Sequence, residues 1–412
     1  MSSGDLISYT YDDDSLLSSA GSSTYTYKGS NTQLESVNLG SLKTEMTYNQ
    51  YGELETLSVT NTTTAQEIYS YSLTRDLLGR ISVKDESISG ISTQYIYDYD
   101  EFSQLKSVSK DSALISQFDY DANGNRTLNN TEVTSYDIQD RVIASNGITH
   151  EFNSNGQLIS LGSVPSNKTF EYDALGMLKK VVLPTSDIIE YVNDARDRRS
   201  VIKKNGIVQK AFIYQDQLNP VAELDGSGNI ISRFVYGSKI NVPEYMIKGG
   251  IEYKIISDHL GSVRLVVNAS TGQVAQRMDY DTWGEVTNDT NPGFQPFGFA
   301  GGIYDQDTGL VKFGARDYDP ETGRWISKDP IRFDGGINLY AYADNDPVNK
   351  IDPNGLWALQ IGGQLTGFFP TAGAGISGGI ALSYSAEHGF QYGTYFNTSG
   401  RGGLGVDYGL AG

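Results

Sequence analysis

The sequence predicts an all-β protein, and three observations support that prediction. The 412 residues include 28 Tyr, 15 Phe and 46 Gly but only 11 Pro, and β-forming residues alternate with turn residues through most of the chain. A short turn pattern recurs along the sequence at the spacing of a hairpin. No stretch keeps the 3.6-residue apolar period and the end caps that a helix needs.

The recurring pattern is Asp or Asn, two residues, then Gly, Ser or Asp, one residue, and an apolar or long side chain. Successive copies between Asn49 and Asp194 are 16 to 27 residues apart. Eight of the ten copies directly follow Tyr or Phe. The copies start at Asp12, Asn49, Asp76, Asp100, Asp121, Asp137, Asn153, Asp173, Asp194 and Asp281.

Each copy is interpreted as the turn of one β-hairpin. In Phe170-Glu-Tyr172 the two aromatic side chains share one face of a strand. Asp173 then opens a tight turn through its side-chain oxygen, and Gly176 accepts the backbone angles that other residues resist. A single hairpin cannot bury its apolar face, so neighbours must stack into a continuous sheet. The repeated Tyr and Asp are therefore interpreted as scaffold rather than as sugar-binding or catalytic groups.

Composition excludes several classes of function. The net charge of −19 argues against nucleic-acid binding by the bulk of the chain, because phosphate binding needs clustered Lys and Arg. The chain has no cysteine, which excludes disulfides and Cys-zinc sites, and its three histidines are scattered. We therefore expect no metal and no cofactor. Residues 1–5 show no signal-peptide pattern, so any export is expected to use another route.

A motif-dense block runs from Asp258 to Leu356. Its Asp-Pro steps at Asp319, Asp346 and Asp352 are interpreted as turn formers, because Pro presets the turn backbone. The motifs, in order, are Asp258-His-Leu-Gly-Ser262, Tyr280-Asp281-Thr-Trp-Gly284, Gly298-Phe-Ala-Gly301, Phe313-Gly-Ala-Arg316-Asp317-Tyr318-Asp319-Pro320, Gly323-Arg324-Trp325, Ser327-Lys-Asp329-Pro330, Asn338-Leu-Tyr-Ala-Tyr342, Asn345-Asp-Pro-Val-Asn349 and Asp352-Pro-Asn-Gly-Leu356.

The repeats resemble the YD repeats of bacterial Rhs proteins, which also occur in toxin-complex C components and teneurins. The motif block resembles the Rhs repeat-associated core domain in the same order. The resemblance implies a YD-repeat shell over residues 1–255, a core domain over 256–356 that closes it, and a variable segment over 357–412. Strand dimensions favour the C-terminal end of a longer shell, or an open partial shell, since the sheet would enclose a lumen barely large enough for the last 56 residues.

The resemblance also implies that the chain cuts itself as an aspartic-type autoprotease. Carried over residue by residue, it makes Arg316, Asp317 and Asp329 the catalytic residues. Two carboxylates that share a proton can activate water and protonate the scissile carbonyl. A hairpin that turns near Glu321-Thr322 would bring Asp317 and Asp329 together. Arg316 would hold a carboxylate or the substrate chain, and a structural ion pair is its alternative role.

The predicted cut lies between Leu356 and Trp357. In this interpretation Asp352, Pro353 and Gly355 form the turn that presents the bond, and they belong to the substrate of the reaction.

The segment over residues 357–412 has 15 Gly and lacks the apolar run of a spanning helix. Alternation in residues 380–384 and 390–392 predicts β-hairpins. It contains no recognisable catalytic set, so no enzymatic activity is expected of it. We expect a truncated cargo, with a membrane-active or β-rich module that continues beyond residue 412 as the alternative.

Together these features predict a self-cleaving shell that encapsulates and delivers a polymorphic toxin, and that is secreted, on the cell surface or delivered to another cell. The expected partners are its own C-terminal segment as cargo, an upstream Rhs shell or secretion spike, and an immunity protein. Two alternatives stay open. One is a structural or adhesive surface protein without cleavage, and the other is an inactive orphan cassette.

Overall fold

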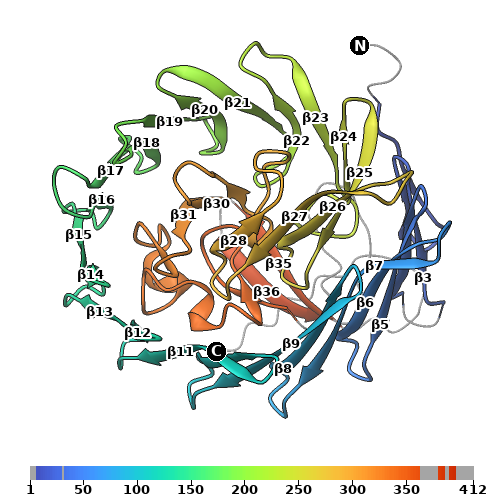
Figure 1. Ribbon diagram of the computed structural model, residues 1–412, viewed down its shortest axis with the longest axis horizontal. Coiled ribbons are helices and arrows are strands. Elements are labelled where there is room, and N and C mark those ends of the chain that lie inside the picture. The colour runs from blue at the N-terminus through green and yellow to red at the C-terminus, as the bar shows by residue number, and fades with distance from the viewer. Residues whose placement is uncertain (1–5, 30–31, 362–378, 386–388, 396–412) are drawn as a thin grey trace.

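The computed structural model describes residues 6–29, 32–361, 379–385 and 389–395. The regular structure of the described chain consists of antiparallel strands and three short 3-10 helices. One long curved sheet forms a wall, and a compact block of short strands and turns lies inside it (Figure 1). The prediction of an all-β protein is therefore confirmed.

The wall strands are β1 (Tyr9–Tyr11), β2 (Leu17–Ala20), β3 (Ser23–Tyr27), β4 (Leu34–Leu39), β5 (Leu42–Tyr48), β6 (Leu54–Asn61), β7 (Gln66–Arg75), β8 (Ile81–Ile88), β9 (Ile91–Tyr99), β10 (Leu105–Lys110), β11 (Ala113–Tyr120), β12 (Arg126–Asn129), β13 (Glu132–Tyr136), β14 (Val142–Ser145), β15 (Ile148–Phe152), β16 (Leu158–Leu161), β17 (Lys168–Tyr172), β18 (Leu178–Val182), β19 (Ile188–Asn193), β20 (Arg199–Lys204), β21 (Ile207–Tyr214), β22 (Pro220–Leu224), β23 (Ile230–Val235), β24 (Tyr245–Lys248), β25 (Ile251–Ser257), β26 (Val263–Asn268), β27 (Val274–Tyr280) and β28 (Val286–Asp289).

The inner elements, called the central block below, are η1 (Phe299–Gly301), β29 (Ile303–Tyr304), β30 (Val311–Phe313), β31 (Arg316–Asp319), β32 (Arg324–Trp325), η2 (Arg332–Gly335), η3 (Ala343–Asn345), β33 (Lys350–Ile351) and β34 (Leu359–Gln360). A separate hairpin follows, made of β35 (Gly379–Ser385) and β36 (Gly389–Tyr395). This hairpin coincides with the two segments that the sequence predicted to be β-structure.

The wall makes a circuit around the central block, so that its first strands lie beside its last ones (Figure 1). At this meeting point the backbone N–H and the hydroxyl of Ser41 both donate to the Ala269 carbonyl, at 2.8 and 2.9 Å. In the part of the chain that the structure describes, no strand pairing joins β28 to β1. The wall therefore spirals past its own start instead of closing as a barrel, as the expectation of an open or partial shell required.

The predicted turns are present at each repeat. At Asp173 the side-chain Oδ1 accepts hydrogen bonds from the backbone N–H groups of Leu175 and Met177, both at 2.9 Å. The turn closes through Gly176, whose φ of 90° lies in the left-handed region that favours glycine. Where Ser or Asp replaces this glycine, as at Ser103 and Asp140, φ is still positive. The Asp or Asn side chain thus holds the turn even without glycine.

The tyrosine before many of the turns joins one hairpin to the preceding one, whereas the Tyr280 hydroxyl donates to Met278 Sδ of its own strand. The Tyr172 hydroxyl donates to the Leu158 carbonyl at 2.8 Å. The acceptor is in each case the first residue of the strand that follows the previous turn. The same bond joins Tyr27 to Leu17, Tyr48 to Leu34, Tyr99 to Ile81, Tyr120 to Leu105, Tyr136 to Arg126, Tyr214 to Arg199 and Tyr236 to Pro220.

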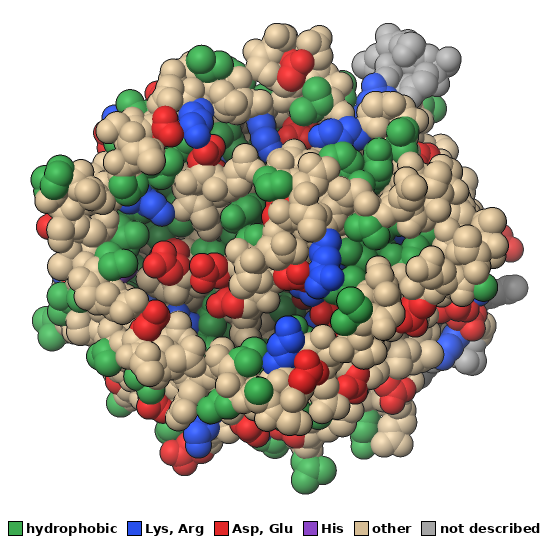
Figure 2. Space-filling model, in the orientation of Figure 1, with side chains coloured by type: hydrophobic (Ala, Val, Ile, Leu, Met, Phe, Trp, Pro, Cys, Tyr) green, Lys and Arg blue, Asp and Glu red, His purple; other side chains and the backbone are tan. Residues whose placement is uncertain are grey.

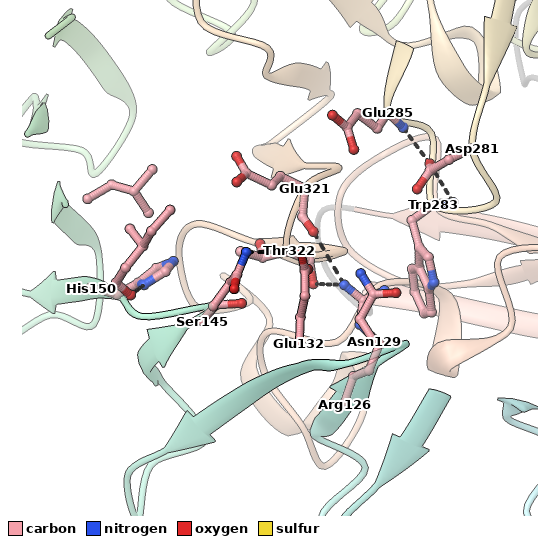
Figure 3. A pocket seen from close by; sticks show the side chains of 13 residues that line it. Arg126, Asn129, Glu132, Ser145, His150, Asp281, Trp283, Glu285, Glu321 and Thr322 are labelled. Carbon is pink, nitrogen blue, oxygen red and sulfur yellow. Dashed lines mark hydrogen bonds between the residues drawn. The ribbon is translucent and has the colours of Figure 1, made fainter. Parts of the chain in front are cut away.

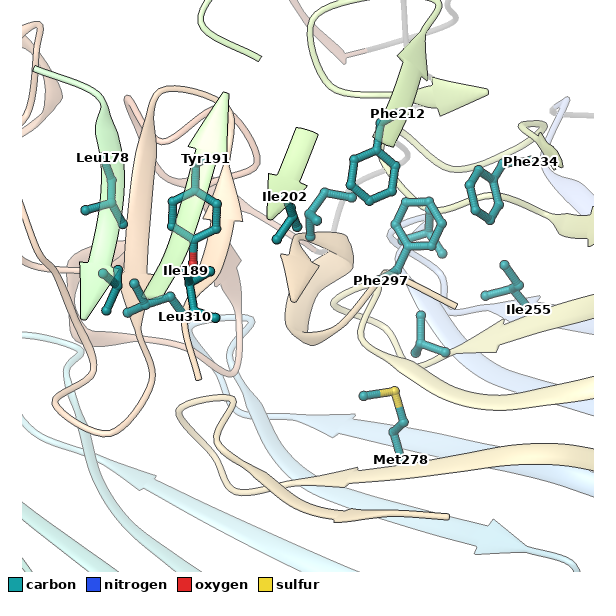
Figure 4. Packing of buried hydrophobic residues seen from close by; sticks show 14 of the residues in the cluster. Leu178, Ile189, Tyr191, Ile202, Phe212, Phe234, Ile255, Met278, Phe297 and Leu310 are labelled. Atoms are coloured by element: carbon teal, nitrogen blue, oxygen red, sulfur yellow. The ribbon is translucent and has the colours of Figure 1, made fainter. Parts of the chain in front are cut away.

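Apolar side chains of the wall point inward and pack against the central block. Figure 4 shows Leu310 of the block beside Leu178, Ile189 and Tyr191 of the wall. These residues belong to one buried cluster. Burial of such side chains is the main favourable term in folding, so wall and block stabilise each other.

The boundary at residues 255 and 256 was predicted from motifs, and it falls inside β25. Asp258 forms the same turn as the repeats, with Oδ1 accepting from the N–H groups of Leu260 and Ser262. The first core motif is therefore built as one more hairpin of the wall. The architecture changes only after β28, which ends at Asp289.

We predict that Tyr172→Phe lowers the free energy of unfolding by about 1 kcal/mol, because the Leu158 carbonyl loses its hydroxyl partner. Urea unfolding of the two proteins measures this difference. Tyr51→Phe is the matched control, since Tyr51 is 78% exposed at a turn tip, and it should leave stability unchanged. Equal stability of Tyr172→Phe and the parent would contradict the inter-repeat role of the hydroxyl.

Candidate functional site

The predicted site residues lie in the middle of the central block. Strand β31 carries Arg316 and Asp317, and it pairs with β32 across a turn that contains Glu321 and Thr322. The sequence prediction of a hairpin turn at this place is confirmed. Neighbouring residues on a strand point to opposite faces, and Arg316 and Asp317 accordingly have different surroundings.

The Arg316 guanidinium is buried, and its N–H groups donate to main-chain carbonyls, one of which lies just before the predicted cut. Its Cζ lies 4.1 Å from the centre of the Trp325 ring, a cation–π contact. Nε donates to the Gly355 carbonyl, and Nη1 donates to the Leu339 carbonyl at 3.2 Å. The arginine therefore holds the main chain just before the predicted scissile bond.

The same guanidinium brings two carboxylates together. Arg316 Nη2 lies 2.8 Å from Asp329 Oδ2 and 3.1 Å from Asp352 Oδ2. All three side chains are almost completely buried. Because the two carboxyl groups and the guanidinium lie close together in a water-poor space, the protonation of each depends on the others. This Arg316–Asp329–Asp352 cluster is the candidate site.

The cluster lies directly on the predicted Leu356–Trp357 bond. Asp352 Oδ1 accepts from the Leu356 N–H at 2.9 Å, and the N–H of Trp357, the nitrogen of that bond, is near enough to help lower the pKa of the Asp352 carboxyl. A Cβ placed on Gly335 would press against both the Leu356 carbonyl oxygen and Asp329 Oδ2, so these two oxygens border the same small space. One carboxylate thus sits at the nitrogen side of the bond and the other at its carbonyl side.

Close backbone packing fixes this arrangement. The Ala315 N–H donates to the Asn354 carbonyl at 2.8 Å, which joins the turn after β30 to the turn before the bond. A Cβ on Gly355 would collide with the Phe313 carbonyl and the Arg316 backbone nitrogen. Gly355 also has a φ of 67°, so only glycine fits here without strain.

Burial raises the pKa of both carboxyl groups. It raises the pKa of Asp352 to about 6, although Arg316 and the N–H groups of Leu356 and Trp357 pull the pKa down. Burial likewise raises the pKa of Asp329, against the opposing effect of Arg316. The negative charge of each acid makes the other harder to ionise. The pair is therefore suited to keep one proton at mildly acidic pH, as acid–base chemistry on a peptide bond requires.

The expectation that Asp317 pairs with Asp329 is not what the structure shows. Asp317 Oδ1 accepts from Arg199 Nη2 at 2.7 Å, and Asp317 Oδ2 lies 3.6 Å from Lys312 Nζ. The physical reason is strand alternation, which turns Asp317 to the face opposite Arg316. From its motif, Asp352 was predicted to be a turn former in the substrate of the cut, and not a member of the acid pair. Both members of the pair open Asp-Pro steps, but so do Asp319 and Asp346, so this feature of the sequence did not distinguish them.

A second feature is a hollow of about 210 Å³ between the wall and the central block. Figure 2 shows acidic side chains gathered beside a hollow on this face, and Figure 3 shows the lining from close by. Its charged and aromatic lining consists of Arg126, Glu132, His150, Asp281, Trp283, Glu285 and Glu321. None of the residues of the candidate site lines this hollow.

Enclosure by protein changes the acidity of the groups around the hollow. It raises the pKa of Asp281 to about 6 and raises the pKa of Glu321, and it lowers the pKa of His150. Within residues 6–29 and 32–361, His, Asp and Glu side chains form no group of three that could hold a metal ion. Within the same residues no helix is long and apolar enough to span a membrane.

Comparison with known proteins identifies relatives of the chain. Its sequence matches the teneurin YD-shell family over residues 2–348. It is 32% identical over 316 residues to Teneurin-1 of Gallus gallus, which covers 72% of this chain and 12% of that protein. It is 27% identical over 280 residues to the tRNA3(Ser)-specific nuclease WapA of Bacillus spizizenii, covering 64% of this chain and 12% of that protein. The chain thus spans only 12% of the length of these relatives.

Solved structures share the fold. The Tc holotoxin pore of Photorhabdus luminescens aligns with a TM-score of 0.71 at 17% identity, over 86% of this chain and 20% of that one. The TcdB2-TccC3-Cdc42 complex aligns with a TM-score of 0.62 at 16% identity, over 85% of this chain and 20% of that one. The resemblance to Rhs-type YD shells that the motifs predicted is therefore confirmed.

We predict that Arg316→Gln destabilises the protein more at pH 8 than at pH 5. Without the arginine, both buried carboxylates lose their cation, so their pKa values rise further and their charged forms become costly. Below these pKa values the acids are protonated, and the penalty disappears. Thermal unfolding at the two pH values measures the difference.

Arg277→Gln is the control for this variant, because Arg277 pairs with Asp279 at a partly exposed position, where ion pairs contribute little. It should lower the melting temperature slightly and equally at both pH values. An Arg316→Gln variant as stable as the parent at pH 8 would argue against a coupled, buried cluster.

Proposed function

The chain belongs to the teneurin YD-shell family, and from that premise we propose that it is a self-cleaving β-shell that cuts its own chain between Leu356 and Trp357. The proposed consequence is release of the segment after Leu356 from covalent attachment to the shell. The observation that supports this proposal most strongly is the position of Arg316, Asp329 and Asp352 around that one peptide bond.

The proposed reaction is hydrolysis by two carboxyl groups that share one proton. The protonated member donates to the Leu356 carbonyl oxygen, which Asp329 borders. The ionised member takes a proton from a water molecule as the water oxygen bonds to the Leu356 carbonyl carbon. That proton then passes to the Trp357 nitrogen as the carbon–nitrogen bond breaks, and one hydroxyl group of the tetrahedral intermediate returns its proton to the first carboxylate. The products are a carboxyl group on Leu356 and an amino group on Trp357.

Arg316 has two roles in this proposal. It keeps the pair of acids close in spite of their mutual repulsion, and through Gly355 it fixes the main chain on the acyl side of the bond. Groups held in one geometry react far faster than free ones. The substrate is part of the same folded chain, so it is already oriented when the fold is complete.

The wider role is proposed from the relatives. The fold is shared with the Tc holotoxin pore, and a nuclease is among the relatives by sequence. We propose that the shell carries the segment after Leu356 as cargo, outside the producing cell or into another cell. An upstream shell or secretion spike and an immunity protein against the cargo are the proposed partners, and the route of export belongs to the same proposal.

We predict that the parent chain is recovered as two pieces that end and begin at Leu356 and Trp357, whereas Asp329→Asn and Asp352→Asn are recovered intact. Each substitution removes a carboxyl group that the proton transfer needs, and losses of at least about a hundredfold are expected. Intact-mass analysis of the purified proteins measures the outcome.

Asp319→Asn is the matched control for these variants, because Asp319 also opens an Asp-Pro step but bonds within its own turn to Glu321 and Thr322. It should be cut as fully as the parent. A parent chain that is folded and uncut would refute self-cleavage, and efficient cutting of Asp352→Asn would refute the assigned pair.

We also predict that cleavage slows as the pH rises through about 6. Burial raises the pKa of Asp352 to about 6, so the pair keeps its shared proton below that pH and loses it above. The fraction cut over time, for chains made in a cell-free reaction and shifted to buffers from pH 5 to pH 9, measures this. A rate that climbs steadily to pH 9 would instead indicate a nucleophilic amine or hydroxyl.

A further inference from the structure

A buried ion pair ties the wall to the strand that carries the candidate site. Arg199, the first residue of wall strand β20, donates through Nη2 to Asp317 Oδ1 on β31 at 2.7 Å. Both side chains are almost inaccessible to water, with 1% and 4% of their surface exposed. Lys312 on β30 supplies a second cation 3.6 Å from the other Asp317 oxygen.

The surroundings of Arg199 hold its guanidinium firmly in place. Its Cζ lies 3.6 Å from the centre of the Tyr191 ring on β19. The Tyr191 hydroxyl in turn donates to Asp305 Oδ2 of the central block at 2.6 Å. Two neighbouring wall strands therefore reach the same region of the block through charged or polar contacts.

Arg199 departs from the pattern of its own repeat position. The first residue of the strand after a repeat turn is apolar and buried at Ile81, Leu105, Val142, Leu158 and Leu178. Only two such positions in wall strands β8 to β20 carry arginine, Arg126 and Arg199. Both arginines reach the hairpin β31–β32, since Arg126 Nη2 donates to the Thr322 carbonyl at 2.7 Å.

A buried arginine in place of an apolar residue costs desolvation free energy. An apolar side chain at position 199 would satisfy the repeat equally well, as the other repeats show. The presence of arginine at position 199 is therefore explained by its ion pair with Asp317, and not by the packing of the wall. Asp317 is the neighbour of Arg316 in a strand of four residues, so a shift of Asp317 moves Arg316 as well.

We propose that Asp317 is a positioning residue that acts through Arg199, and that this pair makes cleavage depend on the wrapped wall. Until β20 lies against the block, Asp317 has no arginine partner, and β31 lacks the contact that sets the place of Arg316. Once the wall is in place, the Arg199–Asp317 pair locks β31, and the Arg316–Asp329–Asp352 cluster is aligned on the bond. The chain is therefore cut only after the shell has formed around it. This inference rests on the proposed self-cleavage.

The test compares cleavage rates of labelled full-length chains made in a cell-free reaction. Arg199→Met should slow cleavage by about tenfold to a hundredfold, the size expected when reacting groups are misplaced. Arg199→Lys keeps the positive charge but loses the planar guanidinium group, so its cleavage should be slowed less than that of Arg199→Met. Asp317→Asn should be slowed to a similar extent as Arg199→Met, and the double variant should be no slower than the slower single one, because both break the same pair.

Arg264→Met is the matched control. Arg264 is also buried and pairs with Glu86 at 2.9 Å, but that pair lies within the wall. This variant should be cut at the parent rate. Urea unfolding of each variant in an uncut Asp352→Asn background shows whether the variant is folded, and how much stability it has lost relative to Arg264→Met. If Arg199→Met is unfolded in that background, the comparison rests on Arg199→Lys.

The pH dependence separates positioning from direct participation. If Asp317 only positions Arg316, Asp317→Asn is cut slowly with the same fall above about pH 6 as the parent. A shifted pH profile, or a folded Asp317→Asn that is not cut while Arg199→Met still is, would show that Asp317 takes part in the reaction and would overturn the inference. So would parent-like rates for Arg199→Met and Arg199→Lys. An uncut parent chain would instead refute the proposed function itself.

Discussion

The hydrogen bond from a tyrosine before a turn to the preceding hairpin, which recurs along the wall from Tyr27 to Tyr236, is the interaction on which the rest of the structure depends. It connects the end of one strand to the start of another, as from Tyr172 to Leu158, and so fixes how each hairpin stacks on its neighbour. Since a hairpin is not stable alone, this repeated link helps to hold neighbouring hairpins together in one wall. The wall in turn creates the enclosed, water-poor space in which the central block carries buried charges.

That enclosed space explains why carboxyl groups able to hold a proton occur inside a protein with a net charge of −19. In water, neighbouring carboxylates such as Asp329 and Asp352 would both be ionised at neutral pH. Inside the wall, burial raises the pKa of each acid, and a single arginine keeps them together. The partly buried Leu356–Trp357 bond lies beside them, so in the proposed function the shell both carries its cargo and provides the surroundings in which the bond is cut.

The sequence predicted the parts of the fold that local chemistry determines. The Asp or Asn turns, the aromatic residue before them and the turn near Glu321 all follow from short motifs, and all are present. The sequence did not predict which acids meet. Asp317 and Asp329 were expected to pair, but strand alternation turns Asp317 toward Arg199, which is 118 residues away in the chain. A contact of that span depends on the path of the whole wall, and nothing near Asp317 in the sequence indicates it.

Cleavage in oxygen-18 water tests the central claim most directly, because it reports which atom attacks the Leu356 carbonyl. If two carboxyl groups activate water at this bond, tandem mass spectrometry of the shell fragment will find one oxygen-18 atom, located in the new C-terminal carboxyl group of Leu356. Oxygen-18 in the side chain of Asp329 or Asp352 would indicate that a carboxylate attacked the chain itself. A new end at any other residue would place the reaction elsewhere, and either result would contradict the account.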